Sequence, residues 1–264
     1  MAESSAALSM KKLQGKVAIV TGGASGIGET TAHLFAEHGA RAVVIADIQD
    51  NKGQSVAAAI GSEIAAYCHC DVTDEEQVKS LVDWTVATYG QLDIMFSNAG
   101  IASRLEQSIL DLDFSEFDRL FAVNARGVVA CAKEAARAMV ELRVKGSIVC
   151  IASVNSRKGV LATDYVMSKH ALLGLVRSAG RQLGQHGIRV NAVSPFVVAT
   201  PLMCELHGKR MSEEEVEKTY EPLIPLKGAA LKAKNVADAV LFLASDDSAL
   251  ITGQDMVIDG GLLA

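Results

Sequence analysis

VAIVTGGASGIG, residues 17–28, joins an apolar run to a glycine-rich turn and then to a helical pattern. The first glycine of such a turn permits a tight exit from a strand, the second lets the backbone approach a pyrophosphate, and the third lets the next helix pack closely. The helix N-terminus offers unpaired N–H groups to an anion. No lysine follows in the turn, which disfavours a nucleoside-triphosphate P-loop. A turn that simply needs glycine is the alternative. The residues that we expect at the phosphates are Gly22, Ser25, Gly26, Ile27 and Gly28.

From residue 16 almost to the C-terminus, short apolar runs alternate with longer amphipathic ones. The short runs predict strands at Val17–Thr21, Ala42–Ala46, Ile64–Cys68, Leu92–Ser97, Ser147–Ala152, Arg189–Ser194 and Met256–Ile258. The longer patterns predict helices near 26–38, 51–60, 74–89, 115–143, 164–185 and 235–244. This alternation is typical of a parallel sheet with right-handed crossovers and helices on both faces. We therefore predict a single α/β domain over 16–264, a doubly wound (Rossmann) fold with a seven-stranded parallel sheet, after a flexible N-terminal segment at 1–15.

Composition limits the class of partner. The 264 residues are 50% hydrophobic and 21% charged, with a formal net charge of −6 and no long run of like charges. A nucleic-acid or anionic-membrane surface is therefore not expected. The first twelve residues lack the apolar core of a signal peptide, and no apolar stretch reaches the roughly 20 residues of a membrane span. We expect a soluble, cytoplasmic protein.

The five cysteines are scattered and odd in number, which indicates free thiols in a reducing compartment. Cys68-His69-Cys70 has side chains of the metal-ligand type. They alternate across a predicted strand, however, and lack the second cluster that a metal site needs. We therefore expect no metal.

Asp47 follows the second predicted strand directly. A carboxylate at that place accepts both ribose hydroxyls of the adenosine of NAD and repels the 2′-phosphate of NADP. The glycine-rich turn also lacks an Arg or Lys that would hold such a phosphate. These observations predict NAD as the cofactor, with Asp47 and the adjacent Ile48 at its adenosine. The alternative is that Asp47 caps the helix that begins near Asp50, although Asp50 is itself the better cap.

Tyr165 and Lys169 stand four residues apart in a helical pattern, hence on one face. A phenol has a pKa near ~10, and a neighbouring cation favours the phenolate. A tyrosine with a pKa lowered in this way takes the hydroxyl proton of an alcohol while hydride leaves for the cofactor. Ser153 lies just past the fifth predicted strand, at the edge where ligands bind in open α/β sheets, so its hydroxyl is expected to bind the substrate oxygen. An exposed helical pair is the alternative for the tyrosine and the lysine.

Together these motifs resemble the short-chain dehydrogenase/reductase family, whose first turn reads TGxxxGIG, over almost all of the chain from Lys16. The resemblance implies a catalytic group of Ser153, Tyr165 and Lys169 with Asn124, which would hold a water that relays protons to the lysine. Ser153 precedes Tyr165 by twelve residues, one fewer than in many members, and the loop between them can absorb that deletion. The resemblance also implies cofactor contacts beyond the first turn, at Asp71, Val72, Asn98, Ala99, Gly100, Tyr165, Lys169, Pro195, Val198 and Thr200. Without it, the segment from Asp71 to Asp74 is explained equally well as a helix N-cap.

Residues 201–227 break the strand–helix alternation, and they predict a small helical substrate lid at about 200–228. A core-packed helix with a solvated acidic face is the alternative for most of this segment. The expected pocket is apolar, which favours a compact hydrophobic alcohol. Phe196, where the family commonly has glycine, either narrows the pocket or packs outward. The residues that we expect in the substrate pocket are Ser153, Val154, Val160, Phe196, Met203 and Leu206.

Within the family, the chain resembles plant-type members of the secoisolariciresinol and borneol dehydrogenase type. The shared segments are Cys70-Asp71-Val72, Phe96 to Gly100, Tyr165 to His170, and Ser194-Pro195-Phe196. This likeness implies an NAD-dependent oxidoreductase that acts on a terpenoid, borneol-like secondary alcohol or ketone. A lignan, another phenolic or a steroid-like alcohol is the alternative within the family. A nucleotide-sensing protein without catalysis is the alternative outside it, and the presence of both Tyr165 and Lys169 argues against that.

The helical pattern 164–185 carries several small residues that permit close helix approach, namely Ala171, Gly174, Ala179, Gly180 and Gly184. Family members commonly pair such helices across a two-fold axis, so the resemblance implies a homodimer or homotetramer. Packing against the sheet of the same chain is the alternative.

Overall fold

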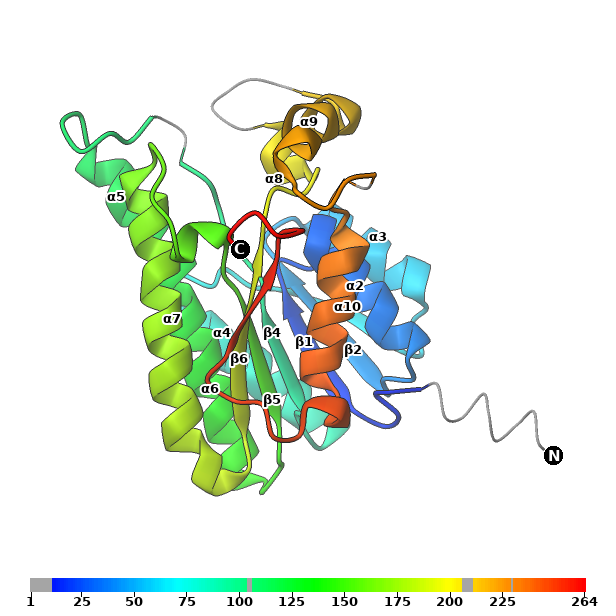
Figure 1. Cartoon of the computed structure of the whole chain (residues 1–264). Coiled ribbons are helices and arrows are strands. Elements are labelled where there is room, and N and C mark those ends of the chain that lie inside the picture. The colour runs from blue at the N-terminus through cyan, green and yellow to red at the C-terminus, as the bar shows by residue number, and fades with distance from the viewer. Residues whose placement is uncertain (1–10, 104–105, 206–210, 229) are drawn as a thin grey trace.

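A computed structural model of the chain describes residues 11–103, 106–205, 211–228 and 230–264. Its described part forms one seven-stranded sheet in the order β3-β2-β1-β4-β5-β6-β7 (Figure 1). Every neighbouring pair is parallel. The chain starts in the middle of the sheet, builds one half, and returns to build the other, so the direction of winding reverses between β1 and β4. The strands are β1 Val17–Thr21, β2 Ala42–Asp47, β3 Ala65–His69, β4 Ile94–Ser97, β5 Ser147–Ile151, β6 Arg189–Pro195 and β7 Asp255–Ile258.

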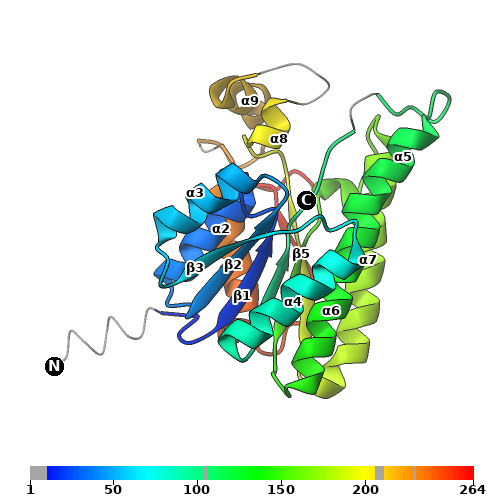
Figure 2. The same ribbon diagram turned by 180° about the vertical axis from the view of Figure 1, so that it is seen from behind.

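Helices cover both faces of the sheet (Figures 1 and 2). One face packs against α2 (Gly26–Glu37), α3 (Asp50–Ile60) and α10 (Ala233–Ala244). The opposite face packs against α4 (Glu75–Tyr89), α6 (Val128–Glu141) and α7 (Thr163–Leu183). The predicted doubly wound α/β fold is confirmed.

The central strands are apolar along their whole length because both of their faces are buried. In β2, Val43 and Ile45 enter the core on the α2 side, whereas Val44 and Ala46 enter the core on the α4 side. All four residues are at most 1% exposed. This is the pattern expected of strands in a parallel sheet that is covered twice.

The predicted helix 115–143 is interrupted. It consists of α5 (Phe114–Phe121), a π-helical turn η1 (Ala122–Gly127) and then α6. At the end of this turn the chain passes so close to the segment after β3 that a Cβ on Gly127 would lie 2.8 Å from Val72 Cγ2. Single π-helical turns are found frequently at functional sites, and this one contains Asn124.

The folded part of the chain begins before Lys16, which corrects the predicted boundary of the flexible segment 1–15. Leu13, inside that segment, is fully buried, and its N–H donates to the carbonyl of His38 at 3.0 Å. The burial of a leucine side chain and the pairing of its backbone fix this part of the chain against the domain. Residues 1–10 of the segment lie outside the described residues.

The described part of the predicted lid region holds α8 (Pro201–Cys204), α9 (Glu213–Tyr220) and a 3-10 turn η5 (Glu221–Leu223). Helices α8 and α9 stand beyond the carboxyl edge of the sheet (Figure 1). A capping box of Ser212 and Glu215 starts α9. Leu206, expected in the substrate pocket, lies outside the described residues. None of the helices in the described ranges is long and apolar enough to cross a membrane.

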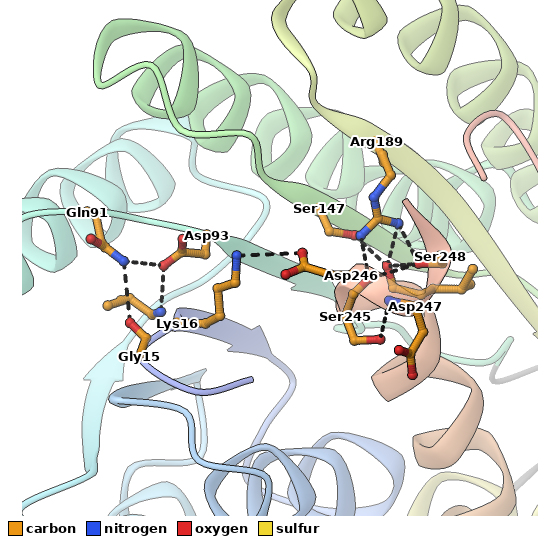
Figure 3. Close-up of polar contacts among 12 residues, drawn as sticks. Gly15, Lys16, Gln91, Asp93, Ser147, Arg189, Ser245, Asp246, Asp247 and Ser248 are labelled. Carbon is orange, nitrogen blue, oxygen red and sulfur yellow. Dashed lines mark hydrogen bonds and ion pairs between the residues drawn. The ribbon is translucent and has the colours of Figure 1, made fainter. Parts of the chain in front are cut away.

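The amino ends of the strands are closed by a polar network (Figure 3). The Arg189 guanidinium at the start of β6 donates to the carbonyl of Leu243 at 2.7 Å, to Ser248 Oγ at 2.7 Å and to the carbonyl of Ser245 at 3.0 Å. Ser147, at the start of β5, donates to the same Leu243 carbonyl at 2.8 Å. These bonds satisfy carbonyls at the end of α10 that have no partner within the helix.

Candidate active site

The glycine-rich turn lies between β1 and α2, at the carboxyl edge of the sheet. Helix α2 begins at Gly26, and its N-cap residue Ser25 makes no side-chain hydrogen bond to the helix. The first N–H groups of α2 are therefore available to an anion. Gly28 packs so closely that a Cβ there would lie 2.2 Å from the carbonyl oxygen of Gly22. Gly22 itself has a φ of +63°, a conformation that favours glycine. This geometry fits the pyrophosphate of a dinucleotide.

Asn98, just past β4, holds the glycine-rich turn in place. Its amide Nδ2 donates to the carbonyls of Thr21 at 2.9 Å and of Gly22 at 3.1 Å. In return, Thr21 Oγ1 accepts from the N–H groups of Asn98 at 3.0 Å and Ala99 at 3.1 Å. The Asn98 side chain therefore shapes the turn. Gly100 lies nearby and faces the predicted catalytic Lys169, since a Cβ on Gly100 would lie 3.9 Å from Lys169 Nζ.

Asp47 ends β2 and is 6% exposed. Its Oδ2 accepts from the N–H of Ala24 at 3.0 Å, and its Oδ1 accepts from the N–H of Gln49 at 3.0 Å. The N-cap position of α3 is Gln49, and no side chain caps that helix, so Asp47 is not the helix cap that the alternative interpretation required. The next residue, Ile48, is 60% exposed, which leaves an apolar surface beside the carboxylate. A carboxylate held in this way beside an apolar side chain fits an adenosine.

Asp71 follows β3 and forms a local turn, because its Oδ1 accepts from both the N–H and the hydroxyl of Thr73, at 2.9 and 2.8 Å. The cap of α4 is Asp74, whose carboxylate accepts from the N–H groups of Glu76 and Gln77. The N-cap alternative therefore applies to Asp74 and not to Asp71. Val72, between them, is 7% exposed.

The end of β6 reaches back to the glycine-rich turn. A Cβ on Gly26 would lie 3.2 Å from Thr200 Cγ2, so the segment after β6 closes one side of the expected cofactor cleft. Pro195 is the last residue of β6, and Val198 is buried against the α2 side of the core. The predicted cofactor residues thus gather along one edge of the sheet, at the ends of several strands.

Tyr165, Lys169 and Ser153 meet at the same edge. Lys169 Nζ lies 5.6 Å from the centroid of the Tyr165 ring and donates to the carbonyl of Ile151, the last residue of β5, at 3.0 Å. The Ser153 hydroxyl is hydrogen-bonded to the phenol of Tyr165 and also accepts from the N–H of Asn155 at 3.1 Å. The three predicted catalytic side chains therefore form one cluster.

Burial dominates the electrostatics of this cluster. Burial lowers the pKa of Lys169 to about 8. It raises the pKa of Tyr165, and the hydrogen bond from Ser153 offsets only part of that increase. The sequence predicted a phenol with a lowered pKa next to a cation. In the protein chain alone the direction is the opposite. Burial removes the hydration of the phenolate, and this raises the pKa of Tyr165 although a lysine lies nearby.

Asn124 joins the cluster through the loop that follows β4. It is fully buried, its Oδ1 accepts from the N–H of Ile101 at 2.8 Å, and its Nδ2 donates to the carbonyl of Ile101 at 2.8 Å. A Cβ on Gly100 would lie 3.4 Å from the same Oδ1. Asn124 therefore holds this loop beside Lys169.

The loop between β5 and α7 carries an anchor that sequence reasoning missed. Arg157 Nε donates to Asp255 Oδ2 at 2.8 Å, and Ser194 Oγ donates to Asp255 Oδ1 at 2.6 Å. Ser156 Oγ donates to the carbonyl of Ser153 and lies 3.3 Å from Ser194 Oγ. The loop that presents Ser153 is thereby tied to β6 and β7. The available signal was the pair of basic residues Arg157 and Lys158 in this loop.

The residues expected in the substrate pocket are only partly together. Val154 and Phe196 pack in one small cluster with Ile224, and the Phe196 ring meets the Tyr220 ring of α9 edge-on at 6.0 Å. Lys158 Nζ lies 5.6 Å from the Phe196 centroid. Val160 is 45% exposed and stands outside this cluster, as does the partly buried Met203.

A cleft of about 350 Å³ lies away from Tyr165, on the other half of the sheet, and is lined by Cys68, His69, Glu76, Gln77, Ser80, Leu81 and Trp84. In Cys68-His69-Cys70 the histidine Nδ1 pairs with Asp50 at 2.7 Å, and Cys70 is buried on the α4 side. Across the described residues, no group of three or more His, Cys, Asp or Glu side chains is placed to hold a metal ion.

Three curated relatives match nearly the whole chain. (−)-Isopiperitenol/(−)-carveol dehydrogenase, mitochondrial, of Mentha piperita is 60% identical over 255 residues, with 96% of each chain covered. (+)-cis,trans-Nepetalactol synthase NEPS2 of Nepeta racemosa is 58% identical, with 96% of this chain and 95% of the relative covered. Secoisolariciresinol dehydrogenase of Forsythia intermedia is 50% identical, with 95% and 90% covered.

Solved structures and a family model agree with these relatives. A short-chain type dehydrogenase/reductase from Mycobacterium marinum superposes with a TM-score of 0.87 at 35% identity, over 97% of this chain and 98% of the other. The 3-ketoacyl-(acyl-carrier-protein) reductase from Brucella melitensis complexed with NADH superposes with a TM-score of 0.86 at 31% identity, over 96% and 100%. A family model described as enoyl-(acyl carrier protein) reductase matches residues 22–263.

Proposed function

The chain belongs to the short-chain dehydrogenase/reductase family, and from that premise we propose that it is an NAD-dependent alcohol dehydrogenase. It transfers a hydride between NAD and a hydrophobic secondary alcohol or ketone. The observation that carries the proposal is the buried cluster of Tyr165, Lys169 and Ser153 beside a glycine-rich helix start, at the point where the winding of the sheet reverses. Open α/β sheets bind their ligands in that crevice.

The chemistry that we assign to the chain's own residues is a proton transfer. The oxidised nicotinamide, when bound, supplies a hydride acceptor and a positive charge. The Tyr165 phenolate takes the proton of the substrate hydroxyl in oxidation, and the resulting phenol returns that proton in reduction. Ser153 holds the substrate oxygen by a hydrogen bond and stabilises its developing negative charge. The Lys169 ammonium, 5.6 Å from the ring centroid, favours the phenolate.

We propose NAD in preference to NADP because of Asp47. Its carboxylate is fixed by two backbone N–H groups at the end of β2, where the ribose of the adenosine is expected. A 2′-phosphate at that place would meet a like charge in a largely buried setting, which disfavours NADP. Measured kcat/KM values for both cofactors test the preference.

For the substrate, we propose a cyclic terpenoid secondary alcohol of the carveol or borneol kind. The relative named isopiperitenol/carveol dehydrogenase is 60% identical, whereas secoisolariciresinol dehydrogenase is 50% identical. Val154 and Phe196 also supply an apolar wall next to Ser153. The test is NADH formation with carveol, borneol and secoisolariciresinol, with Tyr165→Phe as the inactive control. Turnover of the lignan alone would contradict the terpenoid assignment.

A nepetalactol synthase activity is the second candidate, because relatives with that name are 56% to 58% identical. The two candidates differ in one observable. A dehydrogenase forms NADH in step with its product, so product formed without accumulation of NADH would favour the synthase. A non-catalytic nucleotide sensor is disfavoured because Tyr165, Lys169 and Ser153 are all present and in contact.

We propose that the chain assembles as a homodimer or homotetramer through the exposed side of α7. Ala171 and Gly174 are exposed there, and a Cβ at Gly174 would meet no atom within 4 Å. Gly180, in contrast, packs against Gly253 of the same chain, as the internal-packing alternative requires. Light scattering after size-exclusion chromatography tests the assembly. We further propose a cytoplasmic location, to be tested with a fluorescent fusion because the Mentha relative is named mitochondrial.

A further inference from the structure

Asp164, the residue before Tyr165, is fully buried. Its Oδ1 accepts from the hydroxyl of Ser103 at 2.7 Å and from the N–H of Tyr165 at 2.7 Å. Its Oδ2 has no hydrogen-bond partner, and it is the one such buried side-chain oxygen or nitrogen within the described residues. Ser103, its partner, is 4% exposed and belongs to the loop after β4.

Folding stability does not explain a carboxyl group at this place. A buried polar oxygen without a partner carries a desolvation cost that a hydrogen bond normally offsets. The start of α7 offsets part of the cost, because the N-terminus of a helix favours negative charge. The remaining cost indicates that the contact with Ser103 serves another purpose.

The contact joins two segments that carry the reacting groups. Ser103 follows Ile101 by two residues, and Ile101 is itself fixed by both polar atoms of Asn124 at 2.8 Å. A third bond runs from the N–H of Thr163, in the first turn of α7, to the carbonyl of Gln107 at 2.9 Å. The loop after β4 is thus fastened to η1 at one point and to the first turn of α7 at two.

We propose that Asp164 is a positioning residue for Tyr165, acting through Ser103. Their hydrogen bond sets the distance between the first turn of α7 and the loop after β4, and with it the place of the phenol relative to Ser153 and the substrate oxygen. The proposal rests on the proposed function, in which Tyr165 is the acid/base. Turnover is sensitive to such placement, because a shift of about 1 Å costs up to about a hundredfold in rate.

The test compares kcat, KM and melting temperature in Ser103→Ala, Asp164→Ala and the double variant. Each single variant should lower kcat about tenfold or more, leave the KM for NAD within about twofold, and lower the melting temperature, because one buried partner is orphaned. The double variant removes both side chains of the Ser103–Asp164 bond, so its melting temperature should recover in part, since only the N–H of Tyr165 still lacks its acceptor, while kcat stays as low as in the single variants. Ser103→Thr, which keeps the hydroxyl, should restore most of the turnover.

Ser108 and Asp111 provide a matched control in the same loop. Ser108 Oγ donates to Asp111 Oδ2 at 2.9 Å, so this exposed serine–aspartate pair bonds within the loop itself. Ser108→Ala with Asp111→Ala should leave kcat unchanged. If kcat recovers together with the melting temperature in the Ser103/Asp164 double variant, or never falls, the positioning role is wrong. Activity of Tyr165→Phe in the same assay would instead overturn the proposed function.

Discussion

Buried polar groups at the two edges of the parallel sheet differ in how completely they are hydrogen-bonded. At the amino ends of the strands, Asp93 Oδ2 accepts from the N–H of Val17 and from the amide of Gln91, each at 2.7 Å, and Arg189 donates to three acceptors (Figure 3). At the carboxyl ends, the buried Lys169 has a single carbonyl acceptor, and Asp164 keeps an oxygen without a partner among the described residues.

The difference follows from what each edge has to do. Loops at the amino edge only close the core, so their polar groups can pair completely and contribute to stability. Open α/β sheets bind their ligands at the carboxyl edge, and there Lys169 and Asp164 are buried with fewer hydrogen-bond partners than Arg189 has at the amino edge. Substitutions at the amino edge should therefore lower mainly stability, and substitutions at the carboxyl edge should lower mainly turnover. The following experiments test this difference.

The largest effect is expected for Tyr165→Phe. Loss of the phenol hydroxyl removes the acid/base and should lower kcat about a thousandfold, equivalent to about 4 kcal/mol. NAD binding and the melting temperature should stay close to the parent, because the ring keeps its packing. Steady-state NADH formation and calorimetric titration of NAD measure both. Tyr89→Phe, distant in the fold beside Trp84, is the control and should turn over normally. Retained turnover in Tyr165→Phe would refute the assignment.

Arg189→Ala should act on the opposite property. It removes three hydrogen bonds of a charged group at the amino edge, so the free energy of unfolding should fall by about 3 kcal/mol. The KM and kcat of the folded fraction should change by less than about twofold, because no ligand is expected there. Urea denaturation and initial rates measure the two quantities, with the exposed Arg181→Ala as control. A large loss of kcat without loss of stability would break the separation of the two edges.

Lys169→Met tests burial of the ammonium through pH. Burial lowers the pKa of Lys169 from 10.5 to about 8, so the unfolded chain binds this proton more tightly than the folded one. The folded parent is penalised below pH 8, and the penalty is relieved as the pH rises toward 10.5. The stability of Lys169→Met relative to the parent should therefore decrease by about 2 kcal/mol between about pH 7 and 9.5. A difference that does not vary with pH would show an unshifted lysine.

Asp47→Ala should have the smallest effect, on cofactor choice alone. Without the carboxylate, the ratio of kcat/KM for NAD to that for NADP should fall about tenfold, equivalent to about 1.4 kcal/mol. Initial rates with both cofactors measure it, and the exposed Asp83→Ala is the control. An unchanged ratio would mean that Asp47 serves only to hold the turn through Ala24.

Local patterns were sufficient for the fold, whereas the predicted catalytic trio rested on the family resemblance as well. The central strands can be predicted from apolar runs because both of their faces are buried, and the glycine-rich turn can be predicted because only glycine fits next to the carbonyl of Gly22. Tyr165 and Lys169 were singled out by their spacing of four residues, and Ser153 by its place just past the fifth predicted strand. The direction in which the pKa of Tyr165 shifts was not predicted, because burial depends on packing that no local sequence pattern records.

Contacts between distant segments could not be predicted. Asp164 meets Ser103 from 61 positions away, and Arg157 meets Asp255 from 98 positions away. No regular sequence spacing identifies either pair, because each pair forms only after the sheet has brought loops from different strands to one edge. The π-helical interruption at η1 could not be predicted for the same reason, because Asn124 pairs with Ile101, which lies in another loop.

The closed network around Arg189 bears on how such a chain can diversify. Most substitutions destabilise a protein, and those that alter a binding site commonly do so. When the interactions that stabilise the fold lie at the edge opposite the active site, substitutions at the active site leave those interactions intact. Loops at the carboxyl edge are then free to vary in sequence while the domain still folds. Two relatives that are 60% and 58% identical to this chain are named for different activities, an isopiperitenol/carveol dehydrogenase and a nepetalactol synthase. These names agree with a stable amino edge and a carboxyl edge that varies.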